Sequence, residues 1–207
     1  MIAVQMYVRD AGASAVGAAT TAGREDTLSM AEQTTYELQT PHLRLRALSL
    51  GEARLALARR RADLGRLLGA RVPTTWPSSE MIGWLPTIVT DMERQLGDER
   101  WLWLIIEQAT ARVVGDSAFH GPVMGATVEL GWQVVPARQG RGFATEAAAA
   151  LLIWAAARPG VERVIARIAP ENGPSLRVAA KLGMREIASA EPNYRRFEWL
   201  AAGASSD

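Results

Sequence analysis

The first regular pattern along the chain lies at residues 43–48, where apolar and basic side chains alternate as in a strand with one buried face. Residues 49–69 then repeat leucine at helical spacing. This second segment starts with Ser49, which can cap a helix, and it ends at Gly69. The two patterns predict a strand followed by a helix.

Prolines interrupt residues 72–86, so we expect a loop with one short turn there, followed by a helix over residues 86–96. The next segments are rich in apolar, aromatic and β-branched residues. They predict a hairpin and one further strand, at residues 100–108, 113–121 and 126–135.

The last third of the chain alternates helices with strands. Alanine-rich residues 144–157 predict a helix, and residues 161–169 predict a strand. Residues 171–184 predict a compact helix with an asparagine or glycine cap, and residues 195–200 predict a final strand. This order of elements indicates a mixed α/β fold with antiparallel parts.

The ends of the chain lack such patterns. We expect residues 1–33 to form a flexible leader, residues 34–200 the folded domain, and residues 201–207 a polar tail. No stretch approaches the ~20 apolar residues of a membrane span, and no secretory signal is recognisable. We therefore expect a cytoplasmic protein without a membrane partner.

Composition excludes several kinds of chemistry. The chain has no cysteine, which removes disulfides, thiolate metal sites and a cysteine nucleophile. Its 2 histidines, His42 and His120, lack the spacing of metal ligands, so we expect no metal. A formal net charge of +1 argues against a nucleic acid partner.

Glycines gather at residues 139–147, QGRGFATEA, just before a predicted helix. They can serve a tight turn, or they can let a phosphate approach the N–H groups of the helix N-terminus; these alternatives remain open at this point. A Walker A loop is excluded because no Gly-Lys-Ser/Thr follows. A Rossmann loop is disfavoured because Thr145 replaces its third small residue and Glu162 opens the next strand.

Two motifs in order resemble those of the GNAT superfamily of acetyl-CoA-dependent N-acetyltransferases. QGRGFA matches the family's Gln/Arg-x-x-Gly-x-Gly/Ala signature at Gln139, Gly142 and Ala144. The second motif is similar at Asn172, Ser175, Arg177, Val178, Lys181, Leu182, Gly183 and Met184. The resemblance covers residues 40–200 and is strongest to the RimJ/RimL branch. It implies a mixed, mainly antiparallel twisted sheet flanked by helices, with a splayed strand pair for acetyl-CoA.

The resemblance also implies a binding site for acetyl-CoA as co-substrate. Backbone groups of the strand edge from Trp132 to Val135 would hold the pantetheine arm, and the glycine loop would hold the pyrophosphate. The residues implied in binding are Val134, Val135, Arg138, Gln139, Gly140, Arg141, Gly142, Phe143, Ala144, Thr145, Asn172 and Arg177. Arg138 and Arg141 can equally be exposed arginines.

The implied reaction is direct attack of an amine on the thioester in a ternary complex. A backbone N–H near Val134 would stabilise the oxyanion. Many relatives use a tyrosine on the second-motif helix to protonate the thiolate; this chain has none there, and Ser175 takes the place. Glu129 is the candidate base, or orients a water. Alternatively, Asn172 and Ser175 only cap their helix, and Glu129 is an ordinary paired carboxylate.

The acceptor is a protein N-terminus or a small-molecule amine, and Trp76 and Trp84 are candidate acceptor-binding residues. Two other functions remain open: a non-catalytic acetyl-CoA-binding module, and transfer to aminoacyl-tRNA. We expect a monomer or a homodimer.

Overall fold

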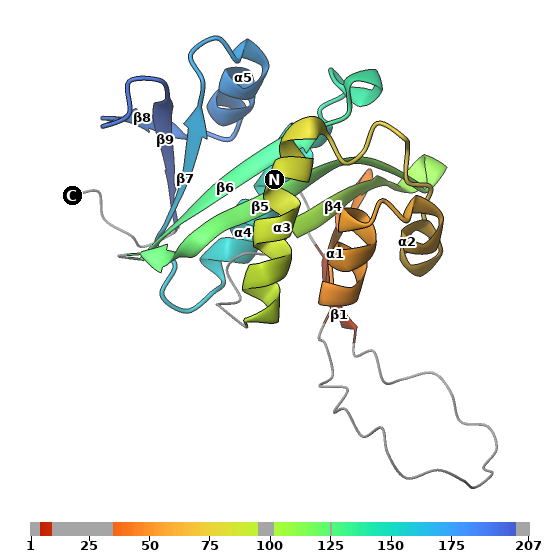
Figure 1. Cartoon of the computed structure of the whole chain (residues 1–207). Coiled ribbons are helices and arrows are strands. Elements are labelled where there is room, and N and C mark those ends of the chain that lie inside the picture. Colours follow the sequence, from red (N-terminus) through yellow and green to blue (C-terminus); the bar gives the residue numbers. More distant parts are fainter. Residues whose placement is uncertain (1–4, 10–34, 95–101, 125, 202–207) are drawn as a thin grey trace, which may run out of the picture.

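The computed structural model describes residues 5–9, 35–94, 102–124 and 126–201 (Figure 1). Within these ranges, the 9 strands of one sheet are Gln5–Arg9 (β1), Thr35–Gln39 (β2), Leu43–Ala47 (β3), Leu102–Glu107 (β4), Arg112–Met124 (β5), Thr127–Val134 (β6), Arg163–Ile168 (β7), Arg185–Ile187 (β8) and Arg195–Leu200 (β9). The α-helices are Leu50–Leu57 (α1), Arg61–Leu68 (α2), Ser79–Glu93 (α3), Phe143–Ala156 (α4) and Gly173–Lys181 (α5).

The strand order is β1-β2-β3-β4-β5-β6-β7-β9-β8. Neighbouring strands are antiparallel except β6 and β7, which run parallel and are joined through α4. The predicted mixed fold with a mainly antiparallel sheet is therefore confirmed. The short strand β8 was not predicted, because its three residues are too few to show a period.

Helices cover both faces of the sheet (Figure 1). Alternate residues of each strand point to opposite faces, so Leu43 and Leu45 of β3 pack with α4, whereas Leu102 and Leu104 of β4 pack with α1 to α3. On the α4 face, Trp154 lies against Trp103 and Phe119, with ring centroids 5.1 and 5.4 Å apart. These aromatic contacts fix α4 over the middle of the sheet.

A hydrogen-bonded tie holds the start of α4. Glu146, in its first turn, accepts hydrogen bonds from the Thr40 hydroxyl at 2.6 Å and from the His42 backbone N–H at 2.8 Å. Both partners lie in the turn between β2 and β3. The N-terminus of α4, and the glycine loop before it, are thereby fixed relative to the sheet.

The segment predicted as one helix over residues 49–69 forms two helices. Ser49 caps α1 as expected, and Gly69 ends α2 with a left-handed φ of 57°. Between them, Arg59 has a φ of 55°, which breaks the helical hydrogen-bond ladder. The sequence gives no warning, because no glycine or proline stands at the break.

The helix predicted from residue 86 begins earlier, at Ser79, where the Ser78 hydroxyl caps it. Pro86 lies inside α3 and removes one backbone hydrogen bond. Leu85 and Ile88 on either side are buried against the sheet. Burial of this apolar face outweighs the cost of the proline, which a local reading of the sequence treats as a stop.

The start of the chain differs from the expected flexible leader, because β1 pairs with β2 from Gln5↔Gln39 to Arg9↔Thr35. The outer edge of β2 offers unpaired backbone groups, and a short β-prone segment satisfies them. Residues 10–33 and 202–207 lie outside the described residues, so the limits 34–200 remain a prediction. Among the described helices, none has the length and apolar character needed to cross a bilayer.

Candidate functional site

The parallel strands β6 and β7 separate partway along their length (Figure 1). They pair from Thr127↔Arg163 to Glu129↔Ile165, although β6 continues to Val134 and β7 to Ile168. The predicted splayed pair is therefore present. It leaves one edge of β6 without a strand neighbour beyond Glu129.

Backbone alternation tells which groups face this gap. The Val135 N–H donates to Val114 O of β5 at 2.8 Å, so it points away from β7. The backbone N–H and C=O groups of successive strand residues point to opposite sides of the strand. Those of Val134 and Trp132 therefore point toward the gap. The Val134 carbonyl accepts from Gln139 Nε2 at 2.9 Å, and the Val134 N–H has no partner in β7, because the pairing of β6 with β7 ends at Glu129.

The Trp132 side chain lies beside the gap. Its ring is partly buried and packs against the core next to α4 and the core next to α5. Its indole Nε1 is buried and has no hydrogen-bond partner among the described residues. A buried donor without an acceptor is costly, so this atom is suited to a ligand group entering the gap.

The glycine loop connects the end of β6 to α4. Gly140 has a φ of 76° and Gly142 a φ of 85°, a backbone region that other residues rarely adopt. A Cβ added at either glycine would meet no protein atom within 4 Å. The protein itself thus needs glycine here for the turn, and the loop surface also stays open to a ligand. The φ values bear out the turn, and the open space is compatible with the close approach of a phosphate.

The N-terminus of α4 has no side-chain cap. The first helical bond runs from the Glu146 N–H to Gly142 O, so the N–H groups of Phe143, Ala144 and Thr145 have no acceptor among the described residues. Phe143 is buried and anchors this first turn. Three free donors at the positive end of a 14-residue helix are chemically suited to an anion such as a phosphate.

The two arginines of the loop differ in their contacts. Arg138 pairs with the buried carboxylate of Glu107 at 3.2 Å. Arg141 lies 3.9 Å from the same carboxylate, and its side chain is 53% exposed. Arg141 is therefore the freer of the two to meet a phosphate.

The second motif forms the N-terminus of α5. Asn172 Oδ1 accepts from the Ser175 backbone N–H at 3.1 Å, so Asn172 caps the helix. The Ser175 hydroxyl takes no part in this cap and is half-buried, without a hydrogen-bond partner among the described residues. Arg177 is exposed on the same helix.

Glu129, the candidate base, is paired. The Arg167 guanidinium donates to it from Nε at 3.0 Å and also bonds Glu191 at 2.9 Å. Hydrogen bonds to Glu129 first, and then to Glu191, raise the pKa of Arg167 above its ordinary value. The alternative of a paired strand carboxylate therefore describes the geometry of Glu129.

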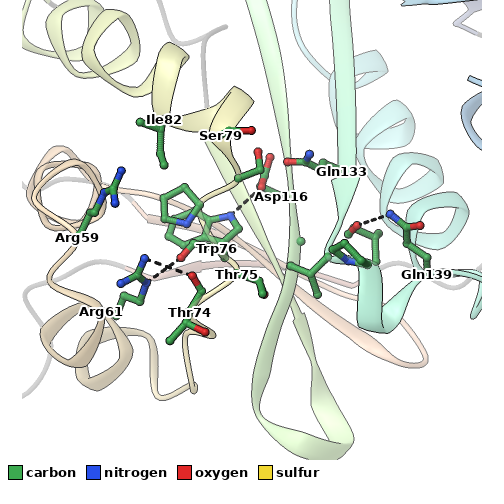
Figure 2. A pocket seen from close by; sticks show the side chains of 16 residues that line it. Arg59, Arg61, Thr74, Thr75, Trp76, Ser79, Ile82, Asp116, Gln133 and Gln139 are labelled. Atoms are coloured by element: carbon green, nitrogen blue, oxygen red, sulfur yellow. Dashed lines mark hydrogen bonds between the residues drawn. The ribbon is translucent and has the colours of Figure 1, made fainter.

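A cavity of about 450 Å³ lies between the sheet and the chain leading from α1 to α3 (Figure 2). Trp76, one of the predicted acceptor-binding residues, lies in its wall and is buried. Trp84 is outside this wall, half exposed on α3 with its ring beside His120. The lining also includes Arg59, Arg61, Thr74, Thr75, Pro77, Ser78, Ser79, Ile82, Gly115, Asp116, Gln133, Val134, Val135, Pro136 and Gln139.

Asp116 of β5 is the residue that the sequence reading missed. It is 3% exposed and accepts a hydrogen bond from Trp76 Nε1 at 2.7 Å (Figure 2). Burial raises its pKa to about 7, although the Trp76 hydrogen bond opposes this shift. A lone carboxylate in the apolar strand at residues 113–121 was the available signal. Among the described residues, no group of three or more His, Cys, Asp or Glu is arranged to hold a metal ion.

Comparison with known proteins agrees with this geometry. A family model described as the acetyltransferase (GNAT) domain matches residues 42–185. YnaD, named an uncharacterized N-acetyltransferase of Bacillus subtilis (strain 168), is 34% identical over 94 residues. That match covers 45% of this chain and 55% of YnaD, so it spans about half the length of the relative.

Solved structures share the fold. A putative GNAT-family acetyltransferase from Bordetella pertussis has a TM-score of 0.54 at 27% identity, over 78% of this chain and 98% of that one. RimJ of Mycobacterium smegmatis, solved in complex with CoA-disulfide, has a TM-score of 0.52 at 20% identity, over 77% and 82%. The resemblance to the superfamily, predicted from two motifs, is confirmed by the family model, and RimJ of Mycobacterium smegmatis shares the fold.

Proposed function

Because this chain belongs to the acetyltransferase (GNAT) domain family, we propose that it transfers the acetyl group of acetyl-CoA to a primary amine. The observation that carries the proposal is the gap between β6 and β7, which opens beside the uncapped N-terminus of α4. One part of the site offers backbone groups to an extended amide chain, and the other offers N–H donors to phosphates. Acetyl-CoA has both parts in the same order.

The pyrophosphate would lie on the N–H groups from Gly140 to Thr145, with Arg141 beside it. Gln139 supports the loop through its bond to Val134 O and contributes no free backbone donor, since its N–H is bonded to Pro136 O. Val135 uses its N–H within the sheet, and Arg138 is held by Glu107. Gln139, Val135 and Arg138 would therefore shape the loop through these contacts.

The pantetheine arm would follow the free edge of β6. Its amides pair with an unoccupied strand edge as an added strand would. The buried Trp132 Nε1 supports this placement, because an amide carbonyl in the gap would give it an acceptor. Asn172 and Arg177 at the start of α5 would border the arm near its thioester end.

The chemistry needs no covalent enzyme intermediate, and the chain has no cysteine to form one. The deprotonated amine attacks the thioester carbonyl carbon, a C–N bond forms and the C–S bond breaks. The Val134 N–H would bind the oxyanion, and the free Ser175 hydroxyl would donate a hydrogen bond to the departing thiolate. The candidate base from the sequence is Glu129 or a water that it orients.

The acceptor would be a protein N-terminus or a small amine, bound in the cavity beside Trp76. Isothermal titration with acetyl-CoA tests the co-substrate site. Release of the CoA thiol, followed with a thiol-reactive dye, tests transfer without background from the protein. Binding without thiol release from any amine would favour the non-catalytic module, and release only with aminoacyl-tRNA would favour that acceptor. Absence of acetyl-CoA binding would contradict both the site and the reaction.

A further inference from the structure

We infer that Asp116, rather than Glu129, accepts the proton that the acceptor ammonium loses, and that the cavity lined by Asp116 and Trp76 is the acceptor site. The inference rests on the proposed transfer to an amine. It assigns the cavity to primary amines that enter as the cation, since a buried carboxylate with room beside it is suited to an ammonium group.

The register of the sheet connects this cavity to the proposed thioester edge. Asp116 of β5 is paired with Gln133 of β6, so their side chains share one face. Gln133, Val134 and Gln139 line the same cavity as Asp116. The Asp116 carboxylate therefore lies on the strand next to β6. The free edge of β6 carries the Val134 N–H that would bind the oxyanion.

The hydrogen bonding of Asp116 leaves one oxygen open. Trp76 Nε1 donates to Oδ2, and no described residue donates to Oδ1. The Glu129 carboxylate differs, because Arg167 Nε lies 3.0 Å from Oε1 and 2.9 Å from Oε2. Both Glu129 oxygens contact the guanidinium, whereas Asp116 lines the cavity and keeps one oxygen without a donor among the described residues.

Burial is the main reason why the pKa of Asp116 rises to about 7, because it disfavours the charged form. The Trp76 hydrogen bond opposes this rise, and repulsion from Glu80 of α3 adds to it. Arg59 and Arg61 line the same cavity, and Arg61 bonds the Thr74 and Trp76 carbonyls. An acid that titrates near 7 can take up a proton and return it at neutral pH, as a general base must.

On the same face of the sheet, His120 and Glu129 form the next titratable pair along β5 and β6. His120 is the cross-strand partner of Glu129, whereas Asp116 is the cross-strand partner of Gln133. Glu129 is neutralised by Arg167, and the His120 ring lies 5.9 Å from Trp84. Glu80 repels Asp116, and Arg59 and Arg61 line its cavity. Arg46 of β3 lies in the same row of the sheet as Asp116, two strands away, and is ion-paired with Glu52 of α1 at 2.7 Å.

The proton balance follows directly. The ammonium gives one proton to the Asp116 carboxylate and becomes a free amine. The amine attacks the thioester carbon. As the C–S bond breaks, the nitrogen loses a second proton, which passes to the sulfur. Asp116 then returns its proton to solvent. The products are the N-acetylated amine, the CoA thiol and one proton.

The experiment compares Asp116→Asn with the parent and with Asp91→Asn, which removes another buried aspartate from α3 away from the cavity. The probes are a peptide with a free N-terminal serine, the same peptide with a blocked N-terminus, and putrescine. Asparagine still accepts from Trp76 Nε1, so a structural role survives the change. We expect Asp116→Asn to lower kcat/KM roughly a hundredfold or more and to lose the limb near pH 7, with acetyl-CoA affinity unchanged.

A second variant, Trp76→Phe, keeps the carboxylate but removes its hydrogen bond. Because that bond lowers the Asp116 pKa, its loss should move the acidic limb to higher pH. Parent-like rates and an unshifted limb in both variants would overturn the inference while the proposed function stands. A parent protein that binds acetyl-CoA and acetylates no probe would overturn the proposed function and the inference with it.

Discussion

Glu129 of β6 is ion-paired with Arg167 of β7, Oε2 to Nε at 2.9 Å, at the point where the two strands separate. The last backbone pair between them is Glu129↔Ile165, and Arg167 crosses the beginning of the gap from two residues beyond. Its second bond, to Glu191, extends the bridge to the chain between β8 and β9. This ion pair holds β6 and β7 together where their paired part ends and the gap begins.

Glu129→Gln should therefore act mainly on structure. A partly exposed ion pair contributes about 0.2–1 kcal/mol to stability, and urea unfolding should show a loss of that size. The pH–rate profile should keep its limb near pH 7, since Asp116 remains. Loss of that limb in Glu129→Gln, with Asp116 intact, would restore Glu129 as the base.

Gly142→Val should abolish acetyl-CoA binding. A branched residue at a φ of 85° is strained, and its side chain would cover the N–H groups at the start of α4. Gly160→Val is the matched control, because Gly160 has a φ of 79° with open space around it but lies outside the loop. Both variants should melt at lower temperature, and only Gly142→Val should lose the thermal shift with acetyl-CoA. Full-strength calorimetric binding by Gly142→Val would contradict the loop assignment.

Ser175→Ala should lower kcat by about ten- to a thousandfold and leave acetyl-CoA affinity nearly unchanged, because its hydroxyl would act as charge develops on sulfur. Stability should barely change, since the helix cap uses the Ser175 backbone N–H. Asn172→Ala should instead cost about 1 kcal/mol of unfolding free energy. Steady-state kinetics with urea unfolding separate the two, and a parent-like kcat in Ser175→Ala would exclude the hydroxyl from the chemistry.

Asp116 should also make stability depend on pH. Its folded pKa of about 7 lies above the ordinary 3.8, so the folded state binds more protons between these values. Stability therefore falls as pH rises from 3.8 to 7 and the carboxylate is forced to ionise in a buried place. Asp116→Asn removes this penalty, and its stability relative to the parent should increase by about 2–3 kcal/mol between pH 5 and pH 8. Urea unfolding at the two pH values measures the difference, which a pH-independent offset would contradict.

Removal of the residues before Met30 should preserve acetyl-CoA binding, because β1 is an edge strand that four other strands separate from β6. It also deletes β1 and exposes the edge of β2. We expect a modest drop in melting temperature and concentration-dependent association, since an open strand edge pairs with other chains. Thermal melting and light scattering test this. Loss of acetyl-CoA binding would show that the N-terminal region reaches the site.

Local patterns in the sequence determined most of the fold. The alternation at residues 43–48, the alanine-rich run before Trp154 and the Asn172 cap each specify an element through its own neighbours, and each element is present as predicted. The glycine loop could also be predicted from the sequence, because only glycine adopts the φ values found at Gly140 and Gly142 without strain.

Tertiary structure alone decided the rest. The break between α1 and α2 at Arg59 has no local signal, and Pro86 lies within a helix because burial against the sheet outweighs local preference. The Glu129 ion pair depends on Arg167, and the buried acid Asp116 depends on Trp76, a residue far away in the chain. Spacing along a sequence cannot report such contacts, since they arise only when strand register brings distant side chains onto the same face.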